Sequence, residues 1–363
     1  MILHLPPPVH GASMVGKHII ESPVINNSFY IEYINLSTSS NVKDVGKGGL
    51  KKVINLINIQ KKVIKALYSK QFDLCYLTLT ASGPGFYKDV MIVFILKILR
   101  RKIIYHFHNK GIESNSNNWL NNILYKFAFA NTKSILLSPR LYTDLEKYVS
   151  KKNVYFCANG IPEDKIFKTY ESLHLNNEKK CRLLFLSNMI IEKGILTLLE
   201  ACKKLKDRGY NYECHFVGDW SNITEVHFKN LVTKNYLSQN VFVHGAKFDN
   251  EKKNFFLTSD IFVLPTYYSN ECFPLVLLEA MSYGLPIVST SEGGIPDIVV
   301  NEKTGFIVQP RDVCELTSKL ELLIDSPNLR KKLGDEGRKR FLNFFTVEKF
   351  EDNMVEILKS SIH

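Results

Sequence analysis

Short runs of apolar residues alternate along the chain with longer segments in which apolar residues recur every three or four positions. The short runs, such as 102–107, 182–187 and 212–217, have the length of buried strands. The longer segments, such as 50–70 and 195–207, have the spacing of helices with one apolar face. Strands that alternate with helices are typical of parallel sheets. The pattern therefore predicts an α/β fold with two comparable halves.

The same patterns predict the remaining elements. Strands are expected at 2–5, 29–36, 73–79, 134–137, 153–156, 241–245, 260–265, 286–290 and 304–308. Helices are expected at 13–21, 86–99, 117–131, 139–148, 249–257, 313–324, 328–343 and 347–360. The polar segments 37–49 and 163–180 are expected to be loops, and the second would link the two halves.

The composition is that of a folded globular protein, with 45% hydrophobic and 23% charged residues among 363. The most apolar run, 90–99, contains Lys97 and is too short to span a bilayer. The first residues, 1–5, lack the basic start of a secretory signal. The seven cysteines form no Cys-x-x-Cys pair and are expected to be reduced thiols, Cys272 included. These features predict a cytoplasmic protein, either free or peripheral on the inner face of the membrane.

The net charge of +11 comes from the first half of the chain. Residues 1–162 hold 21 Lys and Arg against 8 Asp and Glu, whereas the rest of the chain holds 26 against 28. Such an excess suggests an anionic partner, which could be a membrane surface, a phosphorylated acceptor or a nucleic acid. The aromatic-interleaved basic motif of RNA-binding proteins is missing, so we expect no nucleic-acid partner.

Part of the positive charge lies on the predicted helix 50–70. Its face away from the apolar residues carries Lys51, Lys52, Lys61, Lys62 and Lys65. The charges of this face are explained either by a solvated surface helix or by a helix that faces an anionic membrane.

Candidate chemistry is concentrated in residues 271–286, between the strands expected at 260–265 and 286–290. Glu271 falls in the loop beyond a strand end, and Glu279 falls on the next helix, about two turns further on. Ligands of open α/β sheets bind outside such strand ends, and the free N–H groups of a helix start suit an anion. The stretch could therefore hold an anionic, hydroxyl-rich ligand, although either glutamate alone could also be a solvated surface residue.

Glutamates seven residues apart, with Phe-Pro-Leu-Val between them and Glu-Ala-Met-x-x-Gly-x-Pro at the end, resemble glycosyltransferase family 4. These are retaining sugar transferases of GT-B architecture. The similarity covers most of residues 180–345 and is weaker across 1–160. It implies two Rossmann-like domains facing across a cleft, an acceptor-binding domain 1–160 and a nucleotide-sugar-binding domain 161–345. The helix in 346–363 would pack back on the first domain.

The resemblance also implies roles for residues of the second domain. Segment 188–194 is similar to the family's Gly-Arg-x4-Lys-Gly, in which Lys193 matches the lysine that neutralises the donor diphosphate. The family's arginine is replaced by Asn188, so Lys193 should carry more of that load. Glu279 would accept hydrogen bonds from ribose hydroxyls, and Glu271 from those of the donor sugar.

The helix that carries Glu279 would also contact the donor. Pro274 is expected at the first helical position, where a missing N–H costs nothing. The backbone N–H groups of Leu275 and Val276 would then face the diphosphate, with Phe273 in the same loop. The strand that ends at 244–245 matches the place where the family binds the base.

In the first domain the resemblance singles out a glycine and a histidine. Gly11 would face the donor phosphates, and His108 would lie close to the reacting sugar. His106 lies on the same strand face as His108, but a metal pair would lack a third ligand. The chain contains no Asp-x-Asp pair, which agrees with a metal-independent site without a cofactor, the nucleotide sugar being a substrate.

The reaction implied is transfer of a sugar with retention of configuration from a nucleotide-sugar donor, with UDP-sugars favoured over GDP-mannose. The acceptor would be a glycan or a lipid-linked glycan in polysaccharide biosynthesis. Because charge develops on the departing diphosphate, fixed positive charge there lowers the barrier. Two other functions are open. One is a nucleotide-sugar epimerase or hydrolase of the same architecture, and the other is a noncatalytic protein that binds sugar nucleotides.

Overall fold

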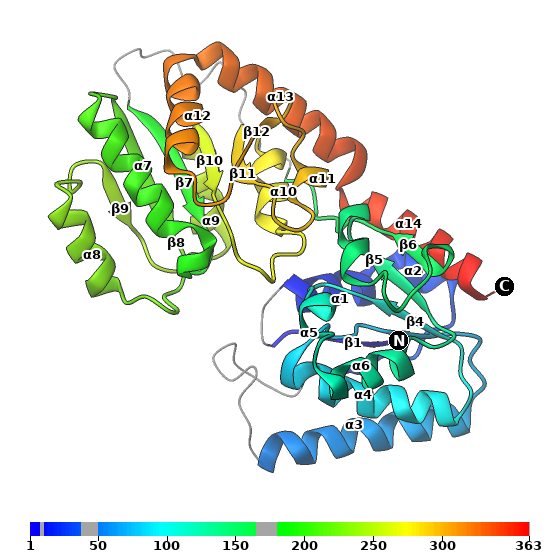
Figure 1. Cartoon of the computed structure of the whole chain (residues 1–363). Coiled ribbons are helices and arrows are strands. Elements are labelled where there is room, and N and C mark those ends of the chain that lie inside the picture. Colours follow the sequence, from blue (N-terminus) through cyan, green and yellow to red (C-terminus); the bar gives the residue numbers. More distant parts are fainter. Residues whose placement is uncertain (8–10, 38–49, 165–179, 363) are drawn as a thin grey trace. The chain divides into compact units, whose positions relative to one another are not determined.

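The computed structural model describes residues 1–7, 11–37, 50–164 and 180–362, and the chain forms two units (Figure 1). The first unit is Met1–Gly160 together with Val347–His363, and the second is Ile161–Thr346. Each unit contains one six-stranded sheet in which every pair of neighbours is parallel. None of the helices in the described ranges is both long and apolar enough to span a membrane.

The sheet of the first unit has the strand order β2-β1-β3-β4-β5-β6. Its strands are β1 (Ile2–Leu3), β2 (Ile34–Asn35), β3 (Cys75–Leu77), β4 (Ile103–His106), β5 (Lys133–Leu136) and β6 (Val154–Phe156). Its helices are α1 (Gly11–Glu21), α2 (Pro23–Ser28), α3 (Leu50–Ser69), α4 (Gly83–Ile98), α5 (Ile112–Asn115), α6 (Trp119–Phe129), two 3-10 turns at Pro139–Asp144 and Lys151–Asn153, and α14 (Val347–Ile362).

Right-handed crossovers place α3, α4 and α6 together on one face of this sheet and α1 on the other. Helix α14 packs against α2, so the last helix of the chain completes the core of the first unit (Figure 1). Its Phe350 and Met354 are buried in one cluster with Leu3 and Ile19. The amphipathic pattern of α14 follows from this burial.

The sheet of the second unit has the strand order β12-β11-β10-β7-β8-β9. Its strands are β7 (Cys181–Leu186), β8 (Tyr212–Val217), β9 (Val241–Val243), β10 (Ile261–Leu264), β11 (Ile287–Thr290) and β12 (Gly305–Val308). Its helices are the 3-10 turn η5 (Ile191–Lys193), α7 (Ile195–Asp207), α8 (Glu225–Lys234), α9 (Asp249–Thr258), α10 (Leu275–Ser282), α11 (Ile295–Ile298), α12 (Val313–Asp325) and α13 (Pro327–Phe344).

The strand order of the second unit reverses between β7 and β10. From β7 the chain proceeds outward to β8 and β9, whereas from β10 it proceeds the opposite way to β11 and β12. The loops that leave β7 and β10 therefore diverge at neighbouring strand ends, which is where open α/β sheets bind ligands.

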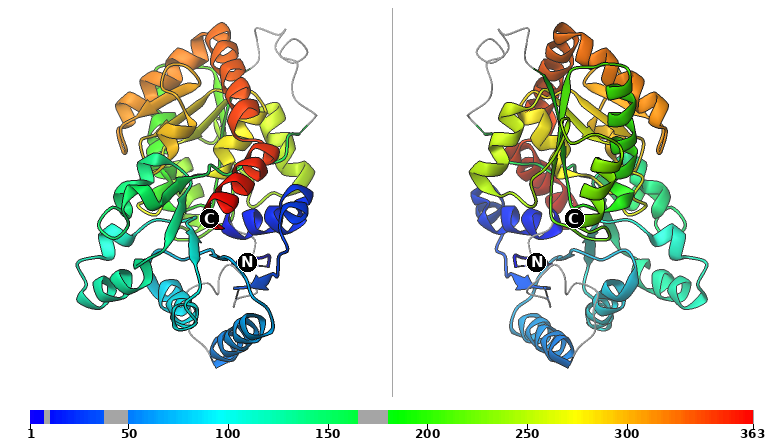
Figure 2. Two further views of the ribbon diagram at one scale, coloured as in Figure 1. Left: turned by 90° about the vertical axis from the view of Figure 1, so that its right-hand side faces the viewer. Right: turned by 90° about the vertical axis from the view of Figure 1, so that its left-hand side faces the viewer.

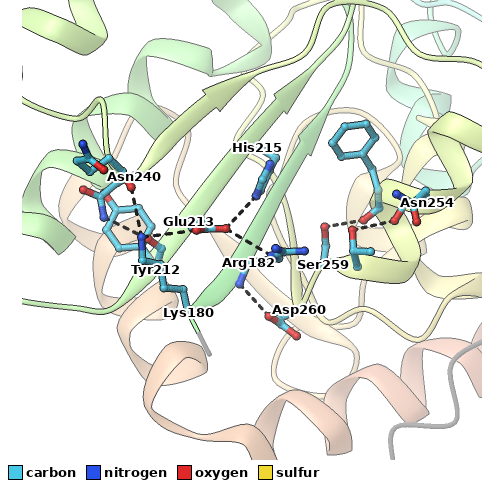
Figure 3. A network of polar contacts seen from close by, with 12 residues as sticks. Lys180, Arg182, Tyr212, Glu213, His215, Asn240, Asn254, Ser259 and Asp260 are labelled. Atoms are coloured by element: carbon cyan, nitrogen blue, oxygen red, sulfur yellow. Dashed lines mark hydrogen bonds and ion pairs between the residues drawn. The ribbon is translucent and has the colours of Figure 1, made fainter. Parts of the chain in front are cut away.

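A network of polar side chains joins the amino ends of β7, β8 and β10 (Figure 3). The backbone N–H of Arg182 donates to Asp260 Oδ2 at 2.8 Å, and its guanidinium Nε lies 3.4 Å from Glu213 Oε2. Lys180 Nζ lies 3.5 Å from the other oxygen of Glu213. The network lies at the amino ends of the strands, opposite the ends at which open α/β sheets bind ligands, so we regard it as structural.

Two predictions for single elements are wrong, and one helix of ten residues was missed. The segment 29–36 is a strand only at Ile34–Asn35, and before it Ser22 caps helix α2 by accepting a hydrogen bond from the N–H of Ile25. The helix expected at 139–148 is a 3-10 turn that ends at Asp144. Helix α8, capped by Thr224, was not predicted. The expected loops at 37–49 and 163–180 fall almost wholly outside the described residues.

Candidate active site

Lys193 and Glu271 meet at the point where the strand order of the second unit reverses. Lys193 ends the 3-10 turn η5 after β7, and Glu271 lies in the loop after β10. The ammonium of Lys193 donates to Glu271 Oε2 at 2.5 Å. Only 14% of the Lys193 side chain and 8% of the Glu271 side chain are exposed. The ring centroid of Tyr268 lies 5.0 Å from Lys193 Nζ and adds a cation–π contact. The structure thus joins two of the predicted site residues directly.

The backbone around Lys193 is held against the end of β10. Gly194 has φ +86°, and a Cβ there would lie 2.1 Å from the carbonyl oxygen of Pro265. The N–H of Tyr267 donates to the carbonyl oxygen of Glu192 at 2.8 Å. A side chain at position 194 would push the two loops apart, so glycine there keeps Lys193 within reach of Glu271.

The loop after β11 supports Glu271 from the other side. Gly293 has φ +53°, and a Cβ there would lie 2.2 Å from the carbonyl oxygen of Glu271. The N–H of Gly294 donates to the carbonyl oxygen of Cys272 at 2.7 Å. Three adjacent strand ends, those of β7, β10 and β11, therefore build this site.

Helix α10 begins at Leu275, and Pro274 is its N-cap rather than its first residue as expected. The structure corrects the prediction by one position. Leu275 and Val276 occupy the first two helical positions, where N–H groups have no acceptor within the helix. Phe273 is buried and its ring packs against Phe345 at 6.0 Å between centroids, so its side chain contributes to the interior.

Glu279 is paired with a cation that the sequence did not single out. Its Oε1 accepts from Lys252 Nζ at 2.6 Å, and about a quarter of each side chain is exposed, 27% for Glu279 and 28% for Lys252. Lys252 lies on α9, in the crossover before β10, and Glu279 lies on α10, in the crossover after it. The pair is made between two helices 27 positions apart, so no local motif could have indicated it.

Asn188 is exposed in the loop after β7. The N–H of the next residue, Met189, donates to the carbonyl oxygen of Asp219 at 2.8 Å, which joins this loop to the one after β8. Gly218 lets the two loops come this close, because a Cβ there would lie 1.7 Å from the carbonyl oxygen of Ser187. The loop position is fixed by the backbone, and the side chain of Asn188 brings no charge to it.

His215 on β8 and His244, directly after β9, form a histidine pair. The Nδ1 of His215 and the Nε2 of His244 are 2.9 Å apart, and the ring of Phe255 lies 4.7 Å from that of His244. Burial, followed by the nearby His215 and Lys247, lowers the pKa of His244 from 6.5 to about 4. His244 is therefore a neutral ring at neutral pH, in the segment for which the sequence predicted contacts to a base.

Gly11 and His108 belong to the first unit. Gly11 begins α1 and is exposed, and a Cβ there would meet nothing within 4 Å. Close packing instead requires Gly16, whose Cβ would lie 2.0 Å from the carbonyl oxygen of His4. The structure therefore gives no steric reason for glycine at position 11, and its predicted contact to donor phosphates stays a prediction.

His108 follows β4 and is half-buried, with its ring centroid 4.2 Å from that of His106. His106 itself is fully buried and its Nδ1 shares a 2.7 Å hydrogen bond with the hydroxyl of Tyr76. Burial lowers the pKa of His106 well below its usual value. His106 is thus a core residue, and of the two histidines His108 is the more accessible. Within the described ranges, no three His, Cys, Asp or Glu side chains are grouped so that they could hold a metal ion.

Part of the chain is similar to known glycosyltransferases. Residues 167–340 match the family described as glycosyl transferases group 1. The capsular polysaccharide biosynthesis glycosyltransferase CapM of Staphylococcus aureus is 31% identical over 190 residues, which cover 49% of this chain and 49% of that protein. The amylovoran biosynthesis glycosyltransferase AmsK of Erwinia amylovora is 27% identical over 232 residues, 62% of this chain and 56% of that one. The chain thus spans about half the length of these relatives.

Solved structures share the fold at lower identity. The lipopolysaccharide outer core galactosyltransferase WaaB matches with a TM-score of 0.73 and 15% identity, over 99% of this chain and 98% of its own. Sucrose-phosphate synthase of Thermosynechococcus elongatus matches with a TM-score of 0.72 and 19% identity, over 99% and 95%. HepE of Anabaena, in complex with UDP, matches with a TM-score of 0.70 and 19% identity, over 84% of this chain and 82% of its own. These likenesses confirm the expected α/β architecture of two GT-B domains.

Proposed function

Because residues 167–340 match the glycosyl transferases group 1 family, we propose that the protein is a glycosyltransferase that takes its sugar from a nucleotide-sugar donor. The nearly buried Lys193–Glu271 pair carries the proposal. Desolvating two charges is costly, and a nearly buried pair at the strand ends where open α/β sheets bind ligands is a candidate functional site. A donor that carries both a diphosphate and sugar hydroxyls matches one group of each charge.

Each group has a task in this reaction. The ammonium of Lys193 stabilises the negative charge that develops on the departing diphosphate, helped by the N–H groups of Leu275 and Val276. Glu271 accepts hydrogen bonds from the hydroxyls of the donor sugar, and Glu279 does so from those of the ribose. In the free site these groups form two ion pairs, Lys193–Glu271 and Lys252–Glu279. When the donor binds, its contacts have to replace these ion pairs. His108 is proposed to lie near the reacting sugar.

We propose a retaining transfer without a metal, in which the acceptor attacks from the face of the leaving group. The departing phosphate then takes the acceptor proton, so the protein needs no nucleophile of its own. A UDP-sugar is the favoured donor, and the UDP complex of the structurally similar HepE supports that choice. Gly11 is proposed to contact the donor phosphates, and Asn188 to contribute hydrogen bonds where the family has an arginine.

The acceptor we propose is a glycan or a lipid-linked glycan in polysaccharide biosynthesis. The names of CapM and AmsK, which refer to capsular polysaccharide and amylovoran, support this choice. A lipid-linked acceptor would require the protein to work in the cytoplasm at the inner face of the membrane.

A panel of UDP- and GDP-sugars tests the proposal. We expect one UDP-sugar to raise the melting temperature of the wild-type protein and Glu279→Gln to weaken that binding about tenfold, because a charged acceptor is lost. The matched control is Glu225→Gln, which removes an exposed carboxylate paired with Lys229 on α8. Binding by no nucleotide sugar, or equal weakening in both variants, would contradict the proposal.

Product analysis then separates transfer from the alternatives. With a glycan acceptor present, the sugar should appear on the acceptor and UDP in solution. Sugar release or epimerisation without any acceptor would instead identify a hydrolase or an epimerase. Tight binding with no product under either condition would identify a noncatalytic binding protein.

A further inference from the structure

Helix α4 is apolar on the side that faces solvent as well as on the side that faces the sheet. Phe86, Val90 and Val93 are buried on the inner side. On the outer side Met91, Phe94 and Ile98 are 50%, 54% and 63% exposed. Their spacing of three and four residues places them in one row on the helix. A surface helix of a soluble protein ordinarily carries polar residues in that row. The exposed apolar row of α4 therefore indicates an interaction surface.

The neighbours of α4 extend this apolar row on both sides. Helix α6 adds Trp119, which is 72% exposed, and Ile123, and the rings of Phe94 and Phe127 meet at 5.8 Å between centroids. Helix α3 adds exposed Ile57 and Tyr68. Both helices contact α4, and Figures 1 and 2 show the three in one layer of the first unit. We call the solvent side of α3, α4 and α6 the outer helix face.

Positive charge surrounds these apolar side chains. Residues 50–133 hold 14 Lys and Arg against 3 Asp and Glu. One of the three acids, Asp89, is buried and lies 3.3 Å from Lys88. Lys61, Lys62 and Lys65 on α3 are exposed, as are Arg100 beyond α4 and Lys126 on α6. The outer helix face therefore combines protruding apolar groups with several exposed cations.

We propose that the outer helix face docks on the surface of an anionic lipid bilayer. The apolar side chains would enter the boundary between headgroups and acyl chains, and the lysines would meet the lipid phosphates. Tyr68 and Trp119 are of the residue types enriched at that depth. A second copy of the chain fits less well, because a symmetric dimer would bring the same positive charges face to face.

The proposal is independent of the catalytic one, since none of the residues on this face belongs to the donor site. If both hold, the first unit would lie on the membrane where a lipid-linked acceptor is available. The donor site can then be tested separately, by nucleotide-dependent stabilisation in solution.

Vesicle flotation tests the proposal with matched variants. The full chain is mixed with vesicles of phosphatidylglycerol and phosphatidylcholine in equal parts, or of phosphatidylcholine alone, at low salt. The test variant is Met91→Glu with Ile98→Glu. The control is Val226→Glu with Leu322→Glu, which changes two exposed apolar residues of the second unit, 70% and 50% exposed. A third variant changes Lys61, Lys62 and Lys65 to Gln.

We expect the wild type and the control to float with anionic vesicles, and only weakly with neutral ones. The test variant should bind anionic vesicles at least tenfold more weakly. The lysine variant should also bind them about tenfold more weakly, and its binding should depend less on salt concentration. Hydrogen-exchange protection in β3 and β4 equal to that of the wild type would show that the first unit of each variant is folded. The proposal is overturned if the wild type ignores anionic vesicles, or if the control loses as much binding as the test variant. It is also overturned if light scattering shows a wild-type dimer that the test variant dissociates.

Discussion

The ammonium of Lys193 and the carboxylate of Glu271 share one short hydrogen bond in a nearly buried position. Each charge makes the burial of the other tolerable, so removing one partner has two effects at once. It deletes a group proposed for the reaction, and it leaves an uncompensated charge inside the protein. A variant test at this pair must separate the two effects.

Lys193→Ala should lower turnover about 100- to 1,000-fold, the usual loss when one donor to a developing anion is removed. It should also cost about 3–5 kcal/mol in the free energy of unfolding, because Glu271 stays buried and unpaired. The double variant Lys193→Met with Glu271→Gln should recover stability but not turnover. Steady-state kinetics and denaturant titration measure the two quantities. Near-wild-type turnover in either variant would disprove the catalytic role.

Lys252 is expected to orient Glu279 for the ribose. Lys252→Met should weaken nucleotide binding about fivefold, equivalent to about 1 kcal/mol for a partly exposed pair. The control is Lys203→Met, which breaks an exposed pair with Asp207 at 2.8 Å on α7. Isothermal calorimetry with UDP measures both. If affinity rises in Lys252→Met, the lysine competes with the ligand for Glu279 instead of orienting it.

His244 predicts a pH dependence of stability. In the unfolded chain its pKa is about 6.5, whereas burial lowers the folded value to about 4. Between those values the unfolded state binds a proton that the folded state does not, so stability should fall as the pH falls from about 6.5 to about 4. His244→Phe keeps a ring against Phe255 and should flatten that dependence. Exposed His227→Gln is the control, and equal slopes in wild type and His244→Phe would refute the assignment.

At the scale of elements, the site is a set of loops that leave β7, β10 and β11 and are fitted together through glycines. Gly194 and Gly293 both have positive φ, and at each a Cβ would approach a carbonyl oxygen of a neighbouring loop to 2.1 or 2.2 Å. The backbone of these loops thus fixes where Lys193 and Glu271 point. A change in loop spacing should therefore affect catalysis before it affects the sheet.

Gly293→Ala tests this dependence. The variant strains a residue with φ +53° and forces the carbonyl of Glu271 to move. We expect about 1–2 kcal/mol of destabilisation and a loss of turnover of about 100-fold, the effect of a misplacement near 1 Å. Gly209→Ala is the matched control, because its φ is +81° but a Cβ there meets nothing within 4 Å. Gly209→Ala should be destabilised by its positive φ in the same way, but its turnover should equal that of the wild type. Equal turnover in the two variants would contradict the role of the loop contact.

The elements that the sequence predicted well are those with a strong periodic pattern. Helix α7 and strand β8 have the expected bounds, Ile195–Asp207 and Tyr212–Val217. The alternation of apolar and polar residues at 29–36 predicted too long a strand. Only Ile34 and Asn35 pair with a neighbouring strand, Ile34 with Ile2. Helix α8 has only two buried residues, Phe228 and Val232, so its apolar pattern is too sparse to indicate a helix.

At the scale of the whole molecule, the first unit is assembled from both ends of the chain, because α14 completes its core. The second unit is one continuous segment, Ile161–Thr346. Side chains of α14, among them Phe350 and Met354, pack on β1 and α1. The two units should therefore respond differently to loss of the last helix.

Deleting residues 347–363 should destabilise the first unit alone. Hydrogen exchange should show lost protection in β1 and β3 and retained protection in β7, β8 and β10, since burial of the apolar face of α14 is absent. Stabilisation of the second unit by nucleotide should persist. Uniform loss of protection throughout both sheets would show that the units do not unfold independently.

The sequence by itself determined the α/β class and most helices and strands, because periodicity and local motifs are properties of neighbours along the chain. It also indicated the residue types of the proposed donor site. It placed Glu271 at a strand end and Glu279 on the next helix. Only the tertiary structure decided the strand order, which makes β7 and β10 neighbours and so joins Lys193 to Glu271 across 78 positions. It also supplied Lys252 as the partner of Glu279 and gathered the outer helix face from three separate helices. These contacts depend on how the sheet is ordered and how helices pack on it, and no local spacing along the chain records that information.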